Sequence, residues 1–173
     1  MPNIGRMIAA SAHRGIAYAE RLIVGIESND FASFARVGDR VIESNHPAFI
    51  CGHLSIYPAN ILQNLDVDAG QIAPTDEFSR LFSHEAKCVD GRNGDVYPAM
   101  DKITDAFFAA YKVATAAIES TDDEVFLREN PNERMRTMFP TIGAMHAFYV
   151  GGHFMMHMGQ WSAWRRVMGM PAA

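Results

Sequence analysis

Apolar side chains recur at helical spacing in four separate stretches of the sequence, and this periodicity constrains the fold more than any other feature. The stretches cover residues 4–27, 47–65, 98–120 and 141–168. Each is long enough for several helical turns with one apolar face. No clear run alternates apolar and polar residues in the manner of a half-buried strand. The pattern therefore predicts an all-α fold built on four helices.

The residues at the expected helix ends favour these boundaries. A Ser-Asn-Asp run at residues 28–30 breaks the first apolar pattern. Ser44 or Asn45 is expected to cap the second helix, and Pro47 fits its first turn. Pro58 lies within the second helix and removes one backbone hydrogen bond. We therefore expect the second helix to be kinked or to end early there.

A long connection separates the second and third helical stretches. Residues 66–97 are rich in Asp, Gly and Pro and contain only a short apolar patch, which predicts one short helix within them. Residues 121–133 are acidic and polar and are expected to form a surface loop. A length of 173 residues suits a single domain. We expect residues 1–173 to form one four-helix bundle with a long crossover between helices two and three.

Charge and composition exclude several classes of partner. The net charge is −5, and the basic residues are scattered apart from the Arg165–Arg166 pair, which argues against nucleic acid. Charged side chains interrupt the first hydrophobic segment, so a membrane span is not expected, and the N-terminus lacks the pattern of a secretion signal. We expect a cytoplasmic protein without a membrane partner, in which Cys51 and Cys88 are reduced.

Two histidines in the last helical stretch form the first candidate metal-binding motif. His153 and His157 are four residues apart, so an α-helix places both imidazoles on one face. Such a pair can bind one divalent ion, and it can equally be a pair of hydrogen-bonded histidines in a helix seam. Their neighbours are largely apolar and offer few partners for an uncharged imidazole. A metal ion would satisfy both rings.

The third ligand is expected on the second helix. We select His53, which lies in mid-helix among apolar residues. Cys51 is the rival, but two residues along a helix are a rotation of about 200°, which turns it away from the site of His53 and into the core. His46 and His146 each precede a proposed ligand by seven residues and lie about 10 Å away along the axis. They are therefore candidates for lining the pocket or capping a helix.

Three motifs stand out in the sequence: His53 in a Gly-His-Leu context, the His-x3-His pair followed by Met158-Gly159-Gln160, and Trp164-Arg165-Arg166 before Gly169 and Pro171. Together these motifs resemble the DinB/YfiT-like superfamily of metal-dependent proteins. The resemblance spans nearly the whole chain in element order. It implies an up-down-down-up bundle, a zinc or nickel ion on His53, His153 and His157, and a homodimer. Members with known activities include S-transferases that use low-molecular-weight thiols, and others are described as hydrolases.

The leading hypothesis is an enzyme acting on a small molecule. A divalent ion on three histidines lowers the pKa of a bound water or thiol and produces a nucleophile at neutral pH. The resemblance slightly favours thiol transfer over hydrolysis. Tyr57 and Tyr149 lie four residues from proposed ligands and are candidates for a catalytic hydroxyl, although both also suit the core. Gln160 and Arg165 are candidates for orienting ligands or binding an acidic group of a thiol cofactor.

Two alternatives remain open. In the first, the ion only fixes helix two against helix four in a non-catalytic dimerisation module, with Glu85 or Asp101 as a fourth ligand. In the second, the histidines merely pack and bind no metal. Trp161 and Trp164 lie close to one helix face, and their exposure would suggest a homodimer surface.

Overall fold

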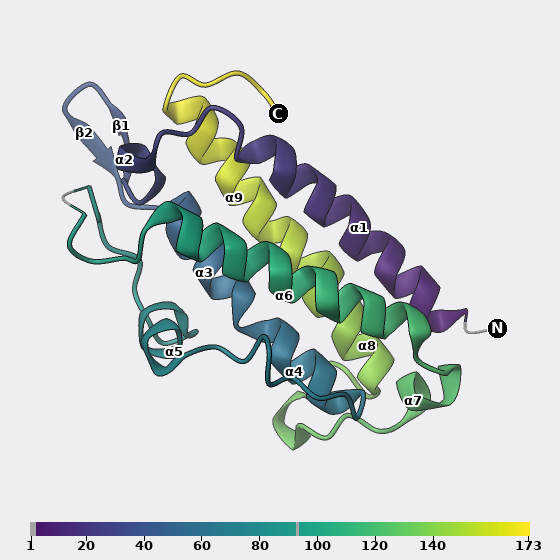
Figure 1. Cartoon of the computed structure of the whole chain (residues 1–173). Helices are drawn as coiled ribbons and strands as arrows, with labels where there is room; N and C mark the ends of the chain where they lie inside the picture. The colour runs from purple at the N-terminus through teal and green to yellow at the C-terminus, as the bar shows by residue number, and fades with distance from the viewer. Residues whose placement is uncertain (1–2, 93) are drawn as a thin grey trace.

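The computed structural model describes residues 3–92 and 94–173, and these are mostly helical, as predicted. Figure 1 shows four long helical stretches lying alongside one another. The first packs against the third and the last, and the third also packs against the second. Their members are α1 (Ile4–Leu22), α3 (Pro47–Ser55) followed by α4 (Tyr57–Asn64), α6 (Met100–Ser120), and α8 (Ile142–Ala147) leading into α9 (Phe154–Val167).

Helix α1 is shorter than the apolar pattern suggests. It ends at Leu22 rather than near residue 27, because Gly25 adopts a positive φ of 77° that leaves the helical path. A short helix, α2 (Ser28–Phe31), begins where the pattern was expected to break. Gly15 faces Phe154 of α9 so closely that a Cβ there would lie 2.7 Å from the ring. This glycine therefore lets α1 and α9 approach each other.

The second helical stretch breaks at the predicted proline. Helix α3 ends at Ser55, and α4 begins at Tyr57 with Pro58 in its first turn. The expected cap was wrong, because His46 takes that position instead of Ser44 or Asn45. The Nδ1 atom of His46 accepts a hydrogen bond of 3.2 Å from the Phe49 N–H. His46 thus has the capping role that was one of its two predicted roles.

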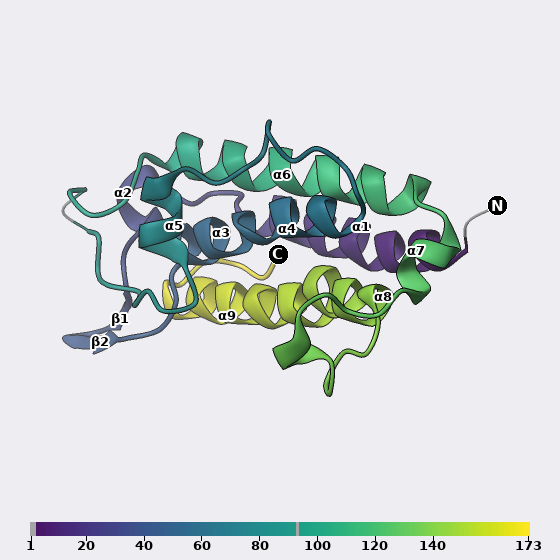
Figure 2. The same ribbon diagram turned by 90° about the horizontal axis from the view of Figure 1, so that it is seen from below.

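A small hairpin corrects the expectation that the chain has no strands. Strands β1 (Ala35–Val37) and β2 (Arg40–Ile42) pair antiparallel, and Ala35 lies opposite Ile42. Gly38 supplies the positive φ of 57° in the turn. Three residues are too few for an alternating pattern to be recognised in a sequence. The hairpin projects from one end of the helical body (Figures 1 and 2).

The long connection contains the short helix that was expected, α5 (Asp76–Phe82), which Thr75 caps. The region expected as a surface loop, 121–133, instead begins with a helix, α7 (Asp123–Leu127). Phe126 is buried and anchors α7, because its ring packs beside Gly5 and its carbonyl and Cβ lie beside Gly143.

The last helical stretch differs from a regular α-helix in its middle. A π-helical segment (Phe148–His153) joins α8 to α9, and Gly169 with a φ of 76° follows the last turn. Trp161 and Trp164 are buried in the core, so they form no exposed stripe. None of the helices in the described residues is both long and apolar enough to cross a membrane.

Candidate metal centre

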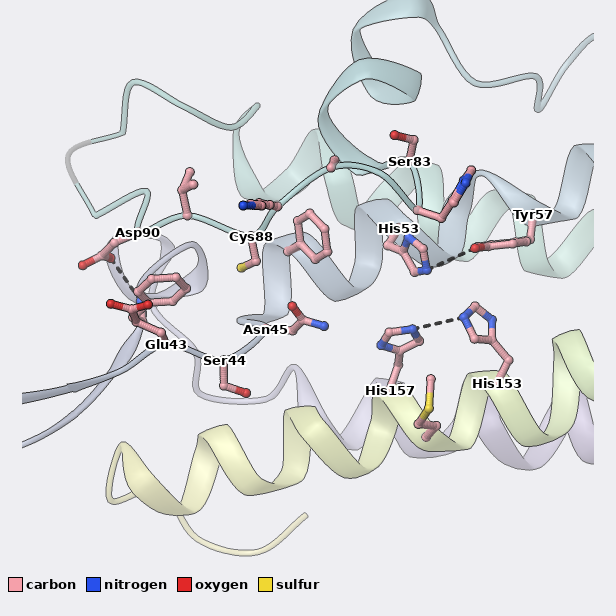
Figure 3. A pocket seen from close by; sticks show the side chains of 17 residues that line it. Glu43, Ser44, Asn45, His53, Tyr57, Ser83, Cys88, Asp90, His153 and His157 are labelled. Atoms are coloured by element: carbon pink, nitrogen blue, oxygen red, sulfur yellow. Dashed lines mark hydrogen bonds between the residues drawn. The ribbon is translucent and has the colours of Figure 1, made fainter.

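Three histidines from two helical stretches meet on one side of the helical body. His53 lies in α3, His153 ends the π-helical segment, and His157 lies in the first turn of α9. One ring nitrogen of each lies within 4.8 Å of the other two, and all three side chains are buried. Figure 3 shows the rings facing one another across a cavity. The residues predicted as metal ligands are therefore brought together.

The hydrogen bonds of these rings define which nitrogens are free. His53 Nδ1 donates to the Phe82 carbonyl at 2.8 Å, and His157 Nδ1 donates to Gln160 Oε1 at 2.9 Å. Each Nε2 therefore carries a lone pair that points toward the cluster. The Nε2 atoms of His153 and His157 lie 3.2 Å apart, and His153 Nδ1 is buried without a partner among the described residues.

This arrangement fits a divalent metal ion. Zinc–nitrogen bonds of 2.0–2.1 Å place two nitrogens of a tetrahedral site roughly 3.3 Å apart, close to the 3.2 Å between His153 and His157. Burial lowers the pKa of both histidines to about 4, and the neighbouring histidines add to the effect, so the rings are neutral at pH 7. Neutral imidazole is the form that binds metal.

The π-helical segment explains why His146 does not share the site. Seven residues of regular helix would place His146 on the face of His153, but the wider π turn changes this phase. His146 is instead fully buried beside Phe126, with its Nε2 3.5 Å from the Asn64 amide. It does not line the cavity.

Tyr57 and Tyr149 both lie near the cluster but in different roles. The Tyr57 hydroxyl donates to His53 Nε2 at 3.2 Å and lines the cavity. Burial raises the pKa of Tyr57 to about 12, so the group stays a donor at neutral pH. The Tyr149 hydroxyl donates to the sulfur of Met135 at 3.4 Å. Tyr149 therefore supports the ring of Tyr57, 5.0 Å away, rather than lining the cavity.

The cavity has a volume of about 780 Å³ and extends from the histidines toward the hairpin. One side is formed mostly by residues 83–90, and we call this stretch together with Phe82 the wall segment. His53 holds one end of it through the Phe82 carbonyl, and His46 Nε2 holds the other by donating to the Val89 carbonyl at 2.9 Å. Asp90 accepts from Phe34 N at 3.0 Å and from Arg36 at 2.8 Å.

Both cysteines are free. Cys51 is buried in the core, as expected, and burial raises the pKa of its thiol. Cys88 is half-buried and lines the cavity, and burial raises its pKa to about 11. Neither thiol is a thiolate at neutral pH, so neither is an activated nucleophile.

Gln160 and Arg165 have separate locations. Gln160 Oε1 accepts from His157 and also from Asn45 Nδ2 at 3.1 Å, so Gln160 contacts a predicted ligand directly. Arg165 is buried away from the cavity and donates to the Leu22 and Val24 carbonyls, each at 2.7 Å. Arg165 therefore ties the end of α1 to α9.

The two residues proposed as a fourth ligand do not reach the histidines. Glu85 is exposed, with its carboxylate 3.9 Å from His84. Asp101 is exposed in the first turn of α6 and accepts from the Lys102 N–H. Within residues 3–92 and 94–173, the group that can hold a metal consists of the three histidines.

Two partners of the ligands were missed by the sequence reasoning. Asn45 was considered only as a cap, and the Phe82 carbonyl carries no sequence signal at all. No family model, curated protein or solved structure matches this chain. The case for a function therefore depends on the geometry of the histidines and their cavity.

Proposed function

We propose that this chain is a metal-dependent enzyme of the DinB-like kind, which activates a thiol or a water molecule at a divalent ion held by three histidines. The observation that carries the proposal is the convergence of His53, His153 and His157 at the wall of a cavity of about 780 Å³. A structural zinc site normally has four protein ligands, whereas a catalytic one has three and an open position. Three ligands beside a cavity favour the catalytic role over a dimerisation module.

The proposed architecture is a single-domain four-helix bundle of up-down-down-up type. Its support is the direction of the helices, because α3–α4 and α6 run the same way along the body and α1 and α9 run the opposite way (Figure 1). Two consecutive parallel helices require a connection as long as the body. The chain between Asn64 and Met100 provides it.

The chain's own residues supply the orientation of the ligands and one donor. A zinc or nickel ion, when bound, lowers the pKa of a coordinated water or thiol. The Phe82 carbonyl orients the ring of His53, and Gln160 orients the ring of His157. The Tyr57 hydroxyl donates a hydrogen bond to His53 Nε2, the nitrogen that faces the other two histidines. Phe49 stacks on His53 with ring centroids 6.0 Å apart and also lines the cavity.

Thiol transfer is slightly favoured over hydrolysis, on the resemblance to DinB-like proteins alone. The substrate in this proposal is a small molecule, with a low-molecular-weight thiol as co-substrate. The resemblance also carries the proposal of a homodimer, whereas the proposal of a cytoplasmic location rests on the charge and hydropathy pattern of the sequence. The buried positions of Trp161 and Trp164 give the homodimer no additional support.

The experiment is to measure the metal content of untagged protein by elemental mass spectrometry. We expect about one zinc or nickel ion per chain in the wild type and none in His53→Ala or His153→Ala. His13→Ala is the matched control, because this histidine is exposed and lies outside the cluster. Wild-type protein without metal after reconstitution with zinc or nickel would contradict the proposal. Metal-loaded protein then justifies a screen of thiol substrates against hydrolysable ones.

A further inference from the structure

A short hydrogen-bond chain connects the cavity wall to one of the proposed ligands. Asn45 Nδ2 donates to Gln160 Oε1 at 3.1 Å, and His157 Nδ1 donates to the same oxygen at 2.9 Å. Asn45 directly precedes the cap of α3 and lines the cavity, whereas Gln160 lies in α9. These two hydrogen bonds therefore link the start of α3 to α9, the two helices that carry the proposed metal centre. The inference drawn from them rests on the proposed function.

The two amides can be hydrogen-bonded in either of two consistent ways. In the observed one, the Gln160 oxygen faces His157, so the imidazole proton is on Nδ1 and Nε2 is free. If both amides were reversed, the Gln160 nitrogen would donate to His157 Nδ1 and to the Asn45 oxygen. The imidazole proton would then be on Nε2, where it blocks a metal ion. The orientation of one amide group thus selects the tautomer of His157.

We propose that Gln160 is a positioning residue that holds His157 in its metal-binding tautomer, and that the hydrogen bond from Asn45 couples the orientation of Gln160 to that of Asn45. His53 has no such dependence, because its Nδ1 donates to the Phe82 backbone carbonyl, which is an acceptor only. The metal centre therefore has one ligand whose tautomer is fixed by the backbone and one whose tautomer is fixed by a reversible side-chain relay.

The decisive variant is Asn45→Asp, which keeps the shape of the side chain and removes its donor. A carboxylate at this position only accepts, so it turns the Gln160 nitrogen toward itself and toward His157. We expect zinc affinity to fall about 10- to 100-fold, the range for loss of an outer partner of a metal-bound histidine. Asn45→Ala removes the anchor without imposing the reversed orientation and should lower the affinity less.

A purely structural role for Asn45 predicts the opposite order. Asp preserves the volume that Ala removes, and a negative charge close to a cation raises affinity. The two variants therefore separate orientation of the amide from packing and charge. Affinity is measured by competition with a chromophoric zinc chelator at pH 7.5.

Gln160→Glu is the matched control within the same relay. Both oxygens of a carboxylate accept, so His157 keeps its proton on Nδ1 and Asn45 keeps its partner. We expect this variant to bind zinc at least as tightly as the wild type. The two acidic substitutions at neighbouring positions thus have opposite expected effects.

The second readout is the tautomer of His157 in the metal-free protein, measured by nitrogen-15 NMR of the imidazole. The proton should be on Nδ1 in the wild type and in Gln160→Glu, and on Nε2 in Asn45→Asp. An Nδ1–H tautomer in Asn45→Asp, or zinc affinity equal to or above that of Asn45→Ala, overturns the relay. Wild-type protein that binds neither zinc nor nickel overturns the proposed function instead, and the tautomers still decide the relay.

Discussion

His46 and His53 lie seven residues apart along one helical stretch, and both hold the wall segment, but only His53 has a nitrogen left for the cavity. His46 donates through Nε2 to the Val89 carbonyl, and His53 donates through Nδ1 to the Phe82 carbonyl. The second nitrogen of His46 accepts the Phe49 N–H, whereas that of His53 faces the other two histidines.

Position along the helix explains this difference. The first N–H groups of a helix have no partner within it, so an imidazole at the cap finds a donor. In mid-helix every N–H is already bonded to a carbonyl one turn back, and the second nitrogen of His53 has nothing of the backbone to accept from. His46 is thus a structural histidine because it lies at the cap of α3, and His53 is a candidate ligand because it lies two turns further along the same helix.

The largest expected effects come from replacing each of these two histidines by alanine. His46→Ala should lower the free energy of unfolding of the metal-free protein by about 3 kcal/mol, from the lost cap and the orphaned Val89 carbonyl, and leave zinc binding in place. His53→Ala should abolish zinc binding. Urea denaturation and metal analysis of the two variants measure both effects.

His13→Ala supplies the reference for that experiment. This side chain is 58% exposed and contacts Glu119 at the surface, so its loss should change the free energy of unfolding by less than about 0.5 kcal/mol. A folded His46→Ala protein that loses its zinc together with its stability would contradict the separation of the two roles.

Lowering the pH should destabilise the protein through its buried histidines, and the effect should be smaller than that of the two alanine substitutions. Burial lowers the pKa of His46, His153 and His157 to about 4 from an ordinary value of 6.5. Between pH 6.5 and 4 the unfolded chain therefore binds protons at these histidines that the folded chain does not bind. The free energy of unfolding should be greatest above pH 6.5 and should fall as the pH approaches 4. Thermal melting between pH 4 and 8 measures this, and stability that rose on acidification would contradict it.

Adding zinc to the same thermal-melting experiment should distinguish the candidate ligands His153 and His157 from the structural His46. Protons compete with the ion for His153 and His157 but not for His46, so added zinc should raise the melting temperature at pH 7.5 and lose that effect toward pH 5. An equal zinc effect in His153→Ala would show that the ion binds elsewhere.

Tyr57→Phe should give the smallest effect. It removes the hydrogen bond that His53 Nε2 accepts and nothing that holds the wall segment. The free energy of unfolding should fall by about 1 kcal/mol or less, and zinc affinity should change by less than the outer-partner range of about tenfold. Denaturation and chelator competition measure both. A complete loss of zinc binding would make Tyr57 part of the ligand set.

The helical content and the three clustered histidines could be predicted from local rules. Apolar spacing identified the helical stretches, Pro58 identified the break between α3 and α4, and the i, i+4 spacing of His153 and His157 placed two rings together. These signals depend on neighbours in the sequence. The third ligand followed from the lack of a local partner for His53, which is also a local argument.

The features that were missed depend on residues far apart in the chain. Asn45 and Gln160 are 115 residues apart, and the Phe82 carbonyl is 29 residues from His53. A backbone carbonyl has no sequence signature, and a hairpin of two three-residue strands is too short to show alternation. Local patterns therefore indicated the ligands but not the groups that orient them.

The π-helical segment has a consequence for insertions and deletions. Its wider turn accommodates a residue that a regular α-helix would exclude. Deleting Gly152 would let the segment become α-helical with the flanking side chains in roughly their present directions, whereas inserting a further residue would rotate all side chains beyond it by about 100° relative to α8. Either Phe154 and Trp161 would leave the core or α8 would turn instead. The contacts along this helix thus tolerate substitution at the two glycines, or the loss of one residue, more readily than a further insertion.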